Sequence, residues 1–139
     1  MKFIQRAFLS LFLSMGAVCA PAMAADAAPL FINLSTDDPQ RAGAAFNFGQ
    51  HQHEGGHPLT IFLSDRGVLL ASRTQIEKGA AQQQMLDELI KKGATVLVVP
   101  MSMKHYGIKE TDLLPGVKIS NRKLSGEALF RDNTRTLSW

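Results

Sequence analysis

The sequence predicts a single α/β domain of the flavodoxin-like class, with a five-stranded, mostly parallel sheet and helices on both faces. Short apolar runs rich in β-branched residues alternate along the chain with longer amphipathic stretches, which is the pattern of strand–helix–strand units. The run at residues 95–99 is apolar and too short for a helix, which is typical of a strand buried on both faces. Right-handed crossovers then leave few topologies, and among these we favour the flavodoxin-like one.

The first 24 residues are expected to lie outside this domain. Lys2 and Arg6 precede an apolar stretch at residues 8–18, and Ala22-Met23-Ala24 fits a signal-peptidase site. The apolar stretch is shorter than the roughly 18–20 residues that a membrane span requires, which favours a cleaved signal peptide over an anchor. We therefore expect residues 1–24 to be a signal peptide and residues 25–139 to be a periplasmic domain with no membrane span.

Composition argues against two classes of function, thiol chemistry and nucleic-acid binding. The only cysteine, Cys19, lies within the expected signal peptide, so cleavage would leave a chain without a thiol. Once Lys2 and Arg6 are removed, basic and acidic residues nearly balance, and no basic run or stripe remains. This pattern argues against nucleic acid as a partner, because nucleic-acid binding depends on clustered positive charge.

The N-terminal part of the domain is expected to be a strand followed by a helix. Residues 30–34 predict the first strand. Asp38 followed by Pro39 is a strong helix start, because an N-cap acceptor precedes a proline at the first helical position. An apolar stripe at helical spacing then runs to Gly55-Gly56, where the helix should end.

The middle of the chain predicts a second strand at residues 58–63 and a turn at residues 64–67. Residues 68–78 are expected to form a loop that lays a short apolar segment on the body of the domain. Residues 80–92 separate apolar from charged side chains at helical spacing, and Gly93 is the expected C-cap of this helix.

The last part of the chain, after the strand at residues 95–99, predicts shorter elements. In chain order these are a short helix at residues 109–114 capped by Thr111, a strand at residues 117–119, a helix at residues 126–131 capped by Ser125, and a closing strand at residues 134–139.

Polar and soft side chains follow the first and third predicted strands. The carboxyl ends of parallel strands meet at one edge of the sheet, where ligands bind in open α/β folds. Helix N-termini at these loops would suit a small anion. The alternative, that these residues only cap helices and fill a surface crevice, remains open. The expected crevice consists of Ser35, Thr36, Asp37, Met101, Ser102, Met103, Lys104, His105 and Tyr106.

Within this crevice His105 could exchange protons near neutral pH, although no motif places a partner beside it. Met101 and Met103 could line a pocket, but we favour a place in the core or in a subunit interface.

His51, His53 and His57, with Glu54 among them, are the weak candidates for metal ligands. On a helix, His51 and His53 would point about 200° apart, and His57 lies beyond two glycines. Histidines at a helix end also interact well with its negative dipole, which accounts for them without a ligand. We therefore expect no metal site here, and no cofactor elsewhere.

Several segments together carry a family resemblance that covers residues 29–139. They are Asp37-Asp38-Pro39-Gln40-Arg41-Ala42, Phe62-Leu63 with Gly67-Val68, Lys92-Gly93-Ala94, Lys104-His105-Tyr106-Gly107-Ile108, Leu113-Leu114-Pro115-Gly116-Val117 and Thr136-Leu137-Ser138-Trp139. In order and spacing they resemble the DsrE family of sulfur-relay proteins (DsrE/DsrF-like), including its exported periplasmic branch.

The resemblance implies a flavodoxin-like subunit that assembles into a homotrimer or homohexamer. Apolar residues that a lone domain would struggle to bury support the same expectation. These are Val68, Leu69, Leu70, Met101 and Met103.

The resemblance also implies that active members carry a persulfide on a cysteine at the end of the third strand. By spacing to Gly107 that position corresponds to Val99, and a second cysteine of some exported relatives corresponds to Ser102. A persulfide needs a thiolate, which neither valine nor serine supplies.

Two functions therefore remain open. We favour a thiol-free binding or assembly module that holds a small sulfur-containing ligand or a periplasmic partner protein. The alternative is an accessory enzyme of periplasmic sulfur or redox metabolism that uses Ser102 and His105.

Overall fold

The computed structural model describes residues 27–75 and 78–139, so the expected signal peptide lies outside the described residues. The described chain forms a five-stranded sheet in the order β4-β3-β2-β1-β5, and every neighbouring pair is parallel. This confirms the predicted α/β class with a parallel sheet. None of the described helices combines the length and the apolar character that a membrane crossing needs.

The strands match the predicted ones closely. They are β1 (Leu30–Leu34), β2 (Leu59–Leu63), β3 (Thr95–Val98), β4 (Lys118–Ile119) and β5 (Arg135–Ser138). In the strand order β2 lies between β1 and β3, so the loop that follows β2 lies between the two loops of the predicted crevice. The short β4 and β5, whose four residues are all exposed at least in part, form the two edges of the sheet.

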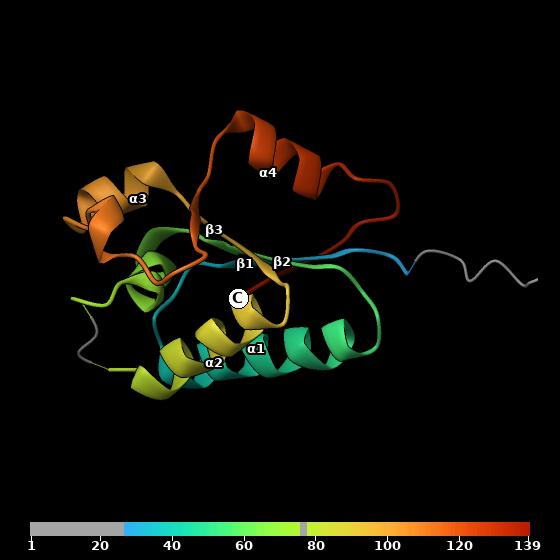
Figure 1. Ribbon diagram of the computed structural model, residues 1–139, viewed down its shortest axis with the longest axis horizontal. Coiled ribbons are helices and arrows are strands. Elements are labelled where there is room, and N and C mark those ends of the chain that lie inside the picture. The colour runs from blue at the N-terminus through green and yellow to red at the C-terminus, as the bar shows by residue number, and fades with distance from the viewer. Residues whose placement is uncertain (1–26, 76–77) are drawn as a thin grey trace, which may run out of the picture.

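The longer helices cover the two faces of the sheet unequally. Helices α1 (Pro39–Glu54) and α2 (Ala80–Lys91) lie side by side on one face, whereas α4 (Arg122–Leu129) alone covers the other (Figure 1). The short helix α3 (Pro100–His105) and the 3₁₀ helices η1 (Asp65–Ala71) and η2 (Glu110–Asp112) connect the remaining strands. Helices on both faces are therefore confirmed.

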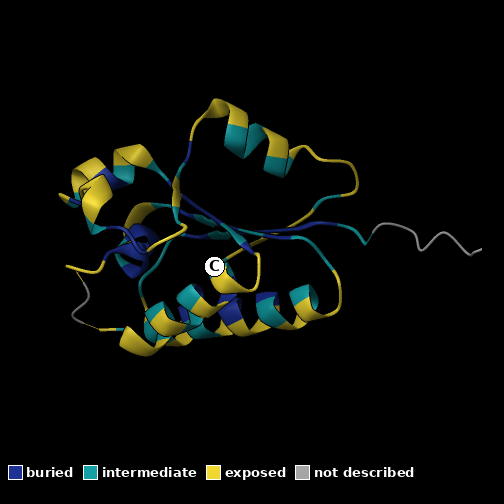
Figure 2. Cartoon of the chain, viewed as in Figure 1, coloured by how far each residue is buried: buried dark blue, intermediate teal, exposed yellow. Residues whose placement is uncertain are grey.

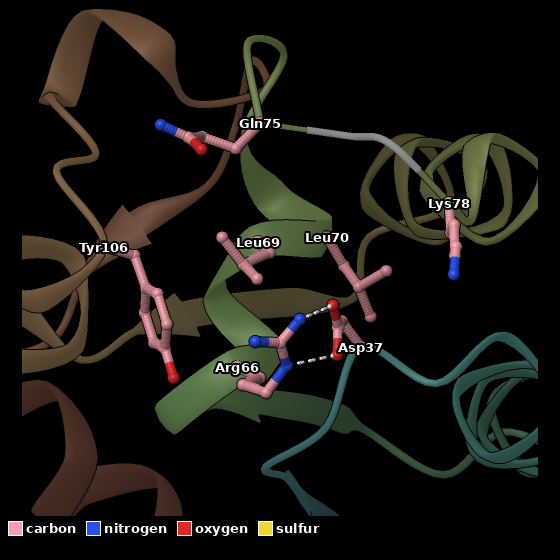
Figure 3. Close-up of a pocket in the computed structure, with 7 residues that line it drawn as sticks. All are labelled: Asp37, Arg66, Leu69, Leu70, Gln75, Lys78 and Tyr106. Carbon is pink, nitrogen blue, oxygen red and sulfur yellow. Dashed lines mark hydrogen bonds and ion pairs between the residues drawn. The ribbon is translucent and has the colours of Figure 1, made fainter.

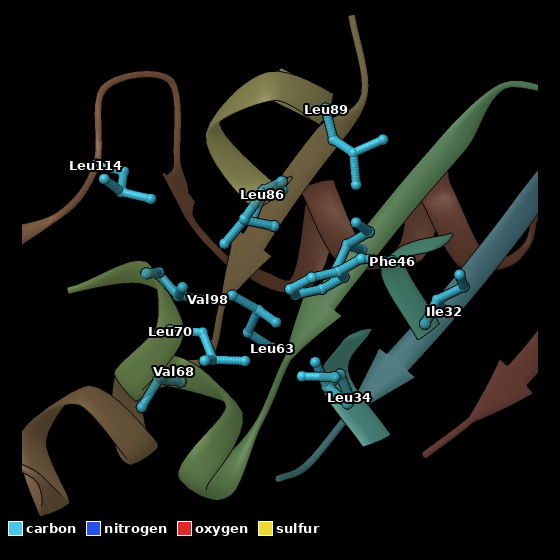
Figure 4. Close-up of a cluster of buried hydrophobic side chains, with 14 of the residues drawn as sticks. Ile32, Leu34, Phe46, Leu63, Val68, Leu70, Leu86, Leu89, Val98 and Leu114 are labelled. Atoms are coloured by element: carbon cyan, nitrogen blue, oxygen red, sulfur yellow. The ribbon is translucent and has the colours of Figure 1, made fainter. Parts of the chain in front are cut away.

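The hydrophobic core lies between the sheet and the α1/α2 layer (Figures 2 and 4). Alternate strand residues point to this face, which follows from the two-residue period of a strand. Phe46 of α1 and Leu86 of α2 pack against them from the helical layer and are fully buried. The strand residues that line this core include Ile32, Leu34, Ile61, Leu63, Val96 and Val98.

The predicted start of α1 is confirmed in detail. The Asp38 carboxylate accepts a hydrogen bond from the Arg41 N–H at 2.9 Å, and Pro39 occupies the first helical position. This cap satisfies one of the backbone donors that a helix leaves free at its N-terminus.

Two expected caps are wrong. Helix α4 begins at Arg122, earlier than expected, because the Asn121 side chain accepts a hydrogen bond from the Leu124 N–H at 2.9 Å. Ser125 therefore lies inside the helix. Thr111 does not cap η2 either, since the Asp112 carboxylate accepts from the Lys109 N–H at the start of that turn.

The expected turn at residues 64–67 and the start of the expected loop at residues 68–78 are wrong, because Asp65–Ala71 form the 3₁₀ helix η1. This helix starts tightly against the end of β1, where a Cβ on Gly67 would lie 2.2 Å from the Leu34 carbonyl oxygen. Its geometry turns Val68 and Leu70 into the core, where they are 0% and 1% exposed. Met103 is also buried, so these residues need no partner subunit to cover them.

Candidate functional site

The loops after β1, β2 and β3 meet at the carboxyl edge of the sheet and enclose a cavity of about 260 Å³ (Figure 3). Figure 3 shows Tyr106 and Lys78 at opposite ends of this cavity, with Asp37 and Arg66 between them. The lining residues are Asp37, Arg66, Leu69, Leu70, Gln75, Lys78 and Tyr106. We refer to it as the Arg66 cavity.

An ion pair forms the centre of the Arg66 cavity. Arg66 donates from Nε to Asp37 Oδ1 and from Nη2 to Asp37 Oδ2, each at 2.7 Å. This two-point geometry is the strong form of a guanidinium–carboxylate contact. The hydrogen bond from Arg66 lowers the pKa of Asp37 and raises that of Arg66 in return.

Tyr106 is tied to the loop that follows β2. Its hydroxyl donates to Asp65 Oδ1 at 2.7 Å, and this bond raises the pKa of Tyr106. The Arg66 guanidinium carbon lies 6.0 Å from the centre of the tyrosine ring, at the outer limit of a cation–π contact. Tyr106 is therefore a protonated donor whose ring faces a cation.

Asp65 has an unusual backbone. Its φ of 43° lies in the left-handed region, which non-glycine residues adopt rarely and which is enriched at functional sites. The conformation is fixed from α3, because the Asp65 N–H donates to Ser102 Oγ at 2.9 Å while its carboxylate accepts from Tyr106. Asp65 thus joins the β2 loop to α3.

A second cavity, of about 250 Å³, shares Tyr106 with the Arg66 cavity and is lined by Asp65, Met101, Ser102, His105 and Tyr106. The His105 ring packs edge-on against Tyr106, with ring centres 4.7 Å apart. Among the hydrogen bonds of the described residues, none joins Ser102 to His105. Ser102 Oγ instead accepts from the Asp65 backbone.

The structure divides the predicted crevice residues into two groups. Asp37 and Tyr106 line the Arg66 cavity, and Met101, Ser102, His105 and Tyr106 line the second one. The others do not line either cavity. Ser35 Oγ donates to the Trp139 carbonyl, Thr36 Oγ1 accepts from the Asp38 N–H, Met103 is buried and Lys104 is exposed.

Val99 is half-buried at the end of β3 and precedes the proline that opens α3. Its N–H donates to the Leu63 carbonyl at 3.0 Å. It therefore lies at the same edge of the sheet as the two cavities but outside their linings.

Two of the three candidate metal-binding histidines have other contacts. Both ring nitrogens of His53 lie within hydrogen-bond distance of carbonyl oxygens, of His57 at 3.0 Å and of Lys92 at 2.9 Å. His57 Nδ1 lies 2.7 Å from the Ala28 carbonyl, and His51 is exposed. Across residues 27–75 and 78–139, no group of three His, Cys, Asp or Glu side chains could hold a metal ion.

Arg66 and Lys78 were not among the site residues predicted from the sequence. The available signal was position, because Arg66 follows the second strand just as Asp37 follows the first. The predicted crevice contains only the loops after the first and third strands, and the strand order places the second loop between them.

Comparison with known proteins adds a family and a fold. A model of the DsrE/DsrF-like family matches residues 29–129. No curated protein gives a match.

Solved structures are similar in fold. The ychN protein from E. coli is 18% identical, with a TM-score of 0.66, over 81% of this chain and 99% of that one. MTH1491 from Methanobacterium thermoautotrophicum, a protein of unknown function, is 16% identical, with a TM-score of 0.63 and the same coverage. At such low identity the likeness concerns the fold alone.

Proposed function

Because the chain belongs to the DsrE/DsrF-like family of sulfur-relay proteins, we propose that it is an exported member without the acceptor cysteine, which binds a ligand instead of carrying sulfur. Residues 25–139 contain no cysteine. Val99 and Ser102 stand where the spacing of the family resemblance places the cysteines. Since sulfane sulfur is carried on a thiolate, this chain keeps the scaffold without the carrier.

The observation that carries the proposal is the Arg66 cavity. Arg66 and Lys78 contribute two positive charges, and Asp37 contributes one negative charge. Within the described residues no ion pair involves Lys78, and Arg66 Nη1 makes no hydrogen bond. These donors favour a small anion, and a volume of about 260 Å³ admits one of a few heavy atoms. Thiosulfate is a suitable probe of this class.

Calorimetric titration of the purified protein with thiosulfate tests the proposal. We expect binding by the wild type and at least tenfold weaker binding by Lys78→Gln, which keeps a side chain of similar length but removes the charge. Arg122→Gln, which changes an exposed arginine on α4, should bind like the wild type. Absence of binding by the wild type, or equal binding by Lys78→Gln, would contradict an anion site in this cavity.

The missing carrier is tested separately. The wild type should take up no sulfane sulfur from a polysulfide, whereas Val99→Cys should take it up, because the substitution places a thiol at the carboxyl edge of the sheet. Uptake by the wild type would show that the family chemistry does not depend on the absent thiol.

The proposal includes export and self-association. Cleavage before Ala25 would place the protein in the periplasm, and family resemblance favours a homotrimer or homohexamer. Intact mass and light scattering of periplasmic protein measure both. Retained residues 1–24 would contradict export, and a clean monomer at micromolar concentration would contradict the assembly.

A second candidate is an accessory enzyme that uses Ser102 and His105. The cavity of about 250 Å³ that exposes both side chains favours it. Its geometry supplies no hydrogen bond from serine to histidine, so the binding module is preferred. Turnover of a sulfur compound that is abolished by His105→Ala, but not by Arg122→Gln, would reverse this preference.

A further inference from the structure

The exposed apolar side chains indicate a different subunit interface from the one predicted from the sequence. Val68, Leu70 and Met103 are buried within one chain, so they offer nothing to a partner. Phe48 and Leu137, by contrast, are 41% and 37% exposed. Both line a cavity of about 360 Å³ on the flank of β5.

This flank has an open backbone edge. Arg135 and Trp139 donate their N–H groups to the carbonyl oxygens of Pro29 and Asn33, at 2.8 and 2.9 Å. Because hydrogen-bonding direction alternates along a strand, the N–H and C=O groups of Thr136 and Ser138 point away from β1. Such an edge is a template for another strand.

The side chains beside this edge are mostly apolar. Register with β1 places Arg135 and Leu137 on the α1 face of the sheet, opposite Leu30 and Ile32. The Trp139 ring lies 6.2 Å from that of Phe48 on the same flank. We define the β5 flank as Phe48, Arg135, Leu137 and Trp139 together with the open edge of β5.

We propose that the β5 flank binds the β5 flank of a second copy of this chain, with the two β5 strands antiparallel about a two-fold axis at Leu137. In this register Thr136 of one chain exchanges backbone hydrogen bonds with Ser138 of the partner subunit. By symmetry, Ser138 of the first chain does the same with Thr136 of the partner subunit. Leu137 then faces Leu137 of the partner subunit, and Arg135 faces Trp139 of the partner subunit. The two sheets join into one.

Self-complementarity is the reason for choosing a second copy as the occupant. The register uses both outward-facing residues, opposes leucine to leucine, and sets a guanidinium beside an indole, which is a favourable cation–π pair. The two Arg135 side chains are four residues apart along the strands. At about 3.4 Å per residue this is about 14 Å, beyond the roughly 8 Å screening length at physiological salt.

The symmetry has a measurable consequence. A two-fold contact produces a dimer, or a hexamer when three such dimers meet about a three-fold axis. A closed trimer contains no two-fold axis, so a trimer alone is incompatible with this contact.

Light scattering on charge-insertion variants tests the surface. Leu137→Lys places two like charges on residues whose Cα atoms would be about 4.5 Å apart across the two-fold axis. The mass should therefore fall by half, from dimer to monomer or from hexamer to trimer. Met101→Lys is the matched control, because Met101 is 80% exposed at the carboxyl edge of the sheet. We expect it to keep the wild-type mass. A monomeric or trimeric wild type, or loss of assembly in Met101→Lys alone, would overturn the proposal.

Cross-linking gives a second readout that does not depend on how well the lysine variant folds. In a Cys19→Ser background, Leu137→Cys puts one thiol at the two-fold axis, where mild oxidation should give a covalent dimer within minutes. Phe130→Cys, at a site that is 82% exposed on the other face, controls for collision between free thiols. Equal cross-linking of the two variants would count against the β5 pairing.

Discussion

The two faces of the sheet are built from similar strands but are covered very differently. On the α1/α2 face, Ile32, Leu34, Ile61, Val96 and Val98 are all fully buried. On the α4 face, Phe31 and Phe62 pack with ring centres 5.6 Å apart under a helix that has no buried residue (Figure 2). Both faces of the sheet carry apolar strand residues, yet only the α1/α2 face is covered by a continuous hydrophobic core.

This difference indicates where the stability of the domain originates. Burial of apolar area is the dominant favourable term in folding, so changes on the α1/α2 face should affect global unfolding. Changes on the α4 face should affect mainly α4 itself, because regions with few buried contacts open locally.

The largest expected effect comes from Phe46→Ala. Phe46 is fully buried between α1 and the sheet, and its removal should lower the free energy of unfolding by about 3–5 kcal/mol. Phe130→Ala, at the end of α4, should change it by no more than about 0.5 kcal/mol, since Phe130 is 82% exposed. Urea denaturation measures the free energy of unfolding of both variants. Similar losses in the two would contradict the difference between the faces.

Glycine substitutions give an effect of intermediate size and opposite sign on the two faces. Gly67→Ala drives a Cβ to 2.2 Å from the Leu34 carbonyl oxygen, which also accepts from the Ser64 N–H at 3.0 Å. We expect a loss of about 1–3 kcal/mol. Gly126→Ala in α4 meets open space and should stabilise by about 0.5–1 kcal/mol, by reducing backbone entropy of the unfolded chain. Thermal melts distinguish these signs, and a neutral Gly67→Ala would show that the approach of η1 to β1 relaxes easily.

Removing the N-cap of α1 or of α4 should lower stability by similar amounts, but the two changes should affect different parts of the protein. Asp38→Ala and Asn121→Ala each remove a side chain that accepts from a helix N–H at 2.9 Å, at a cost of about 1 kcal/mol. Hydrogen exchange should show faster global opening in the first variant and faster exchange confined to residues 122–129 in the second. Protection lost across the whole sheet in Asn121→Ala would mean that α4 unfolds together with the core.

The strands and the two long helices were predictable because their patterns are local. Residues 30–34 and 95–98 are apolar runs of strand length, and Asp38-Pro39 fixes the start of α1 within a few residues. The η1 helix was not predictable in this way, because its geometry depends on the close approach of Gly67 to Leu34. The Asn121 cap was missed for a different reason, since its signal is local and was assigned to Ser125.

The candidate site was only partly predictable. Its position at the carboxyl edge followed from the parallel sheet, and Asp37 and Tyr106 were found by that logic. Arg66 was missed because its importance depends on strand order, which brings the loop after β2 between the other two. A pairing between residues 37 and 66 carries no periodicity that a sequence reveals.

The smallest expected effect concerns that ion pair, which lies at the edge of the well-covered face. The Arg66 side chain is 54% exposed, so solvent screens the pair and its contribution to global stability should be slight. The effect on Asp37 itself should still be visible. Hydrogen bonding from Arg66 lowers the pKa of Asp37 below its ordinary value of 3.8.

Because the pKa of Asp37 is lower in the folded than in the unfolded chain, the pair stabilises the fold above about pH 3.8. That contribution is lost as the pH falls through the folded-state value. Carbon-detected NMR titration should therefore show the pKa of Asp37 rising in Arg66→Gln and staying unchanged in Arg122→Gln. An unchanged pKa in Arg66→Gln would mean that the pair does not persist in solution. The Arg66 cavity would then contain a guanidinium that is free to donate to an anionic ligand.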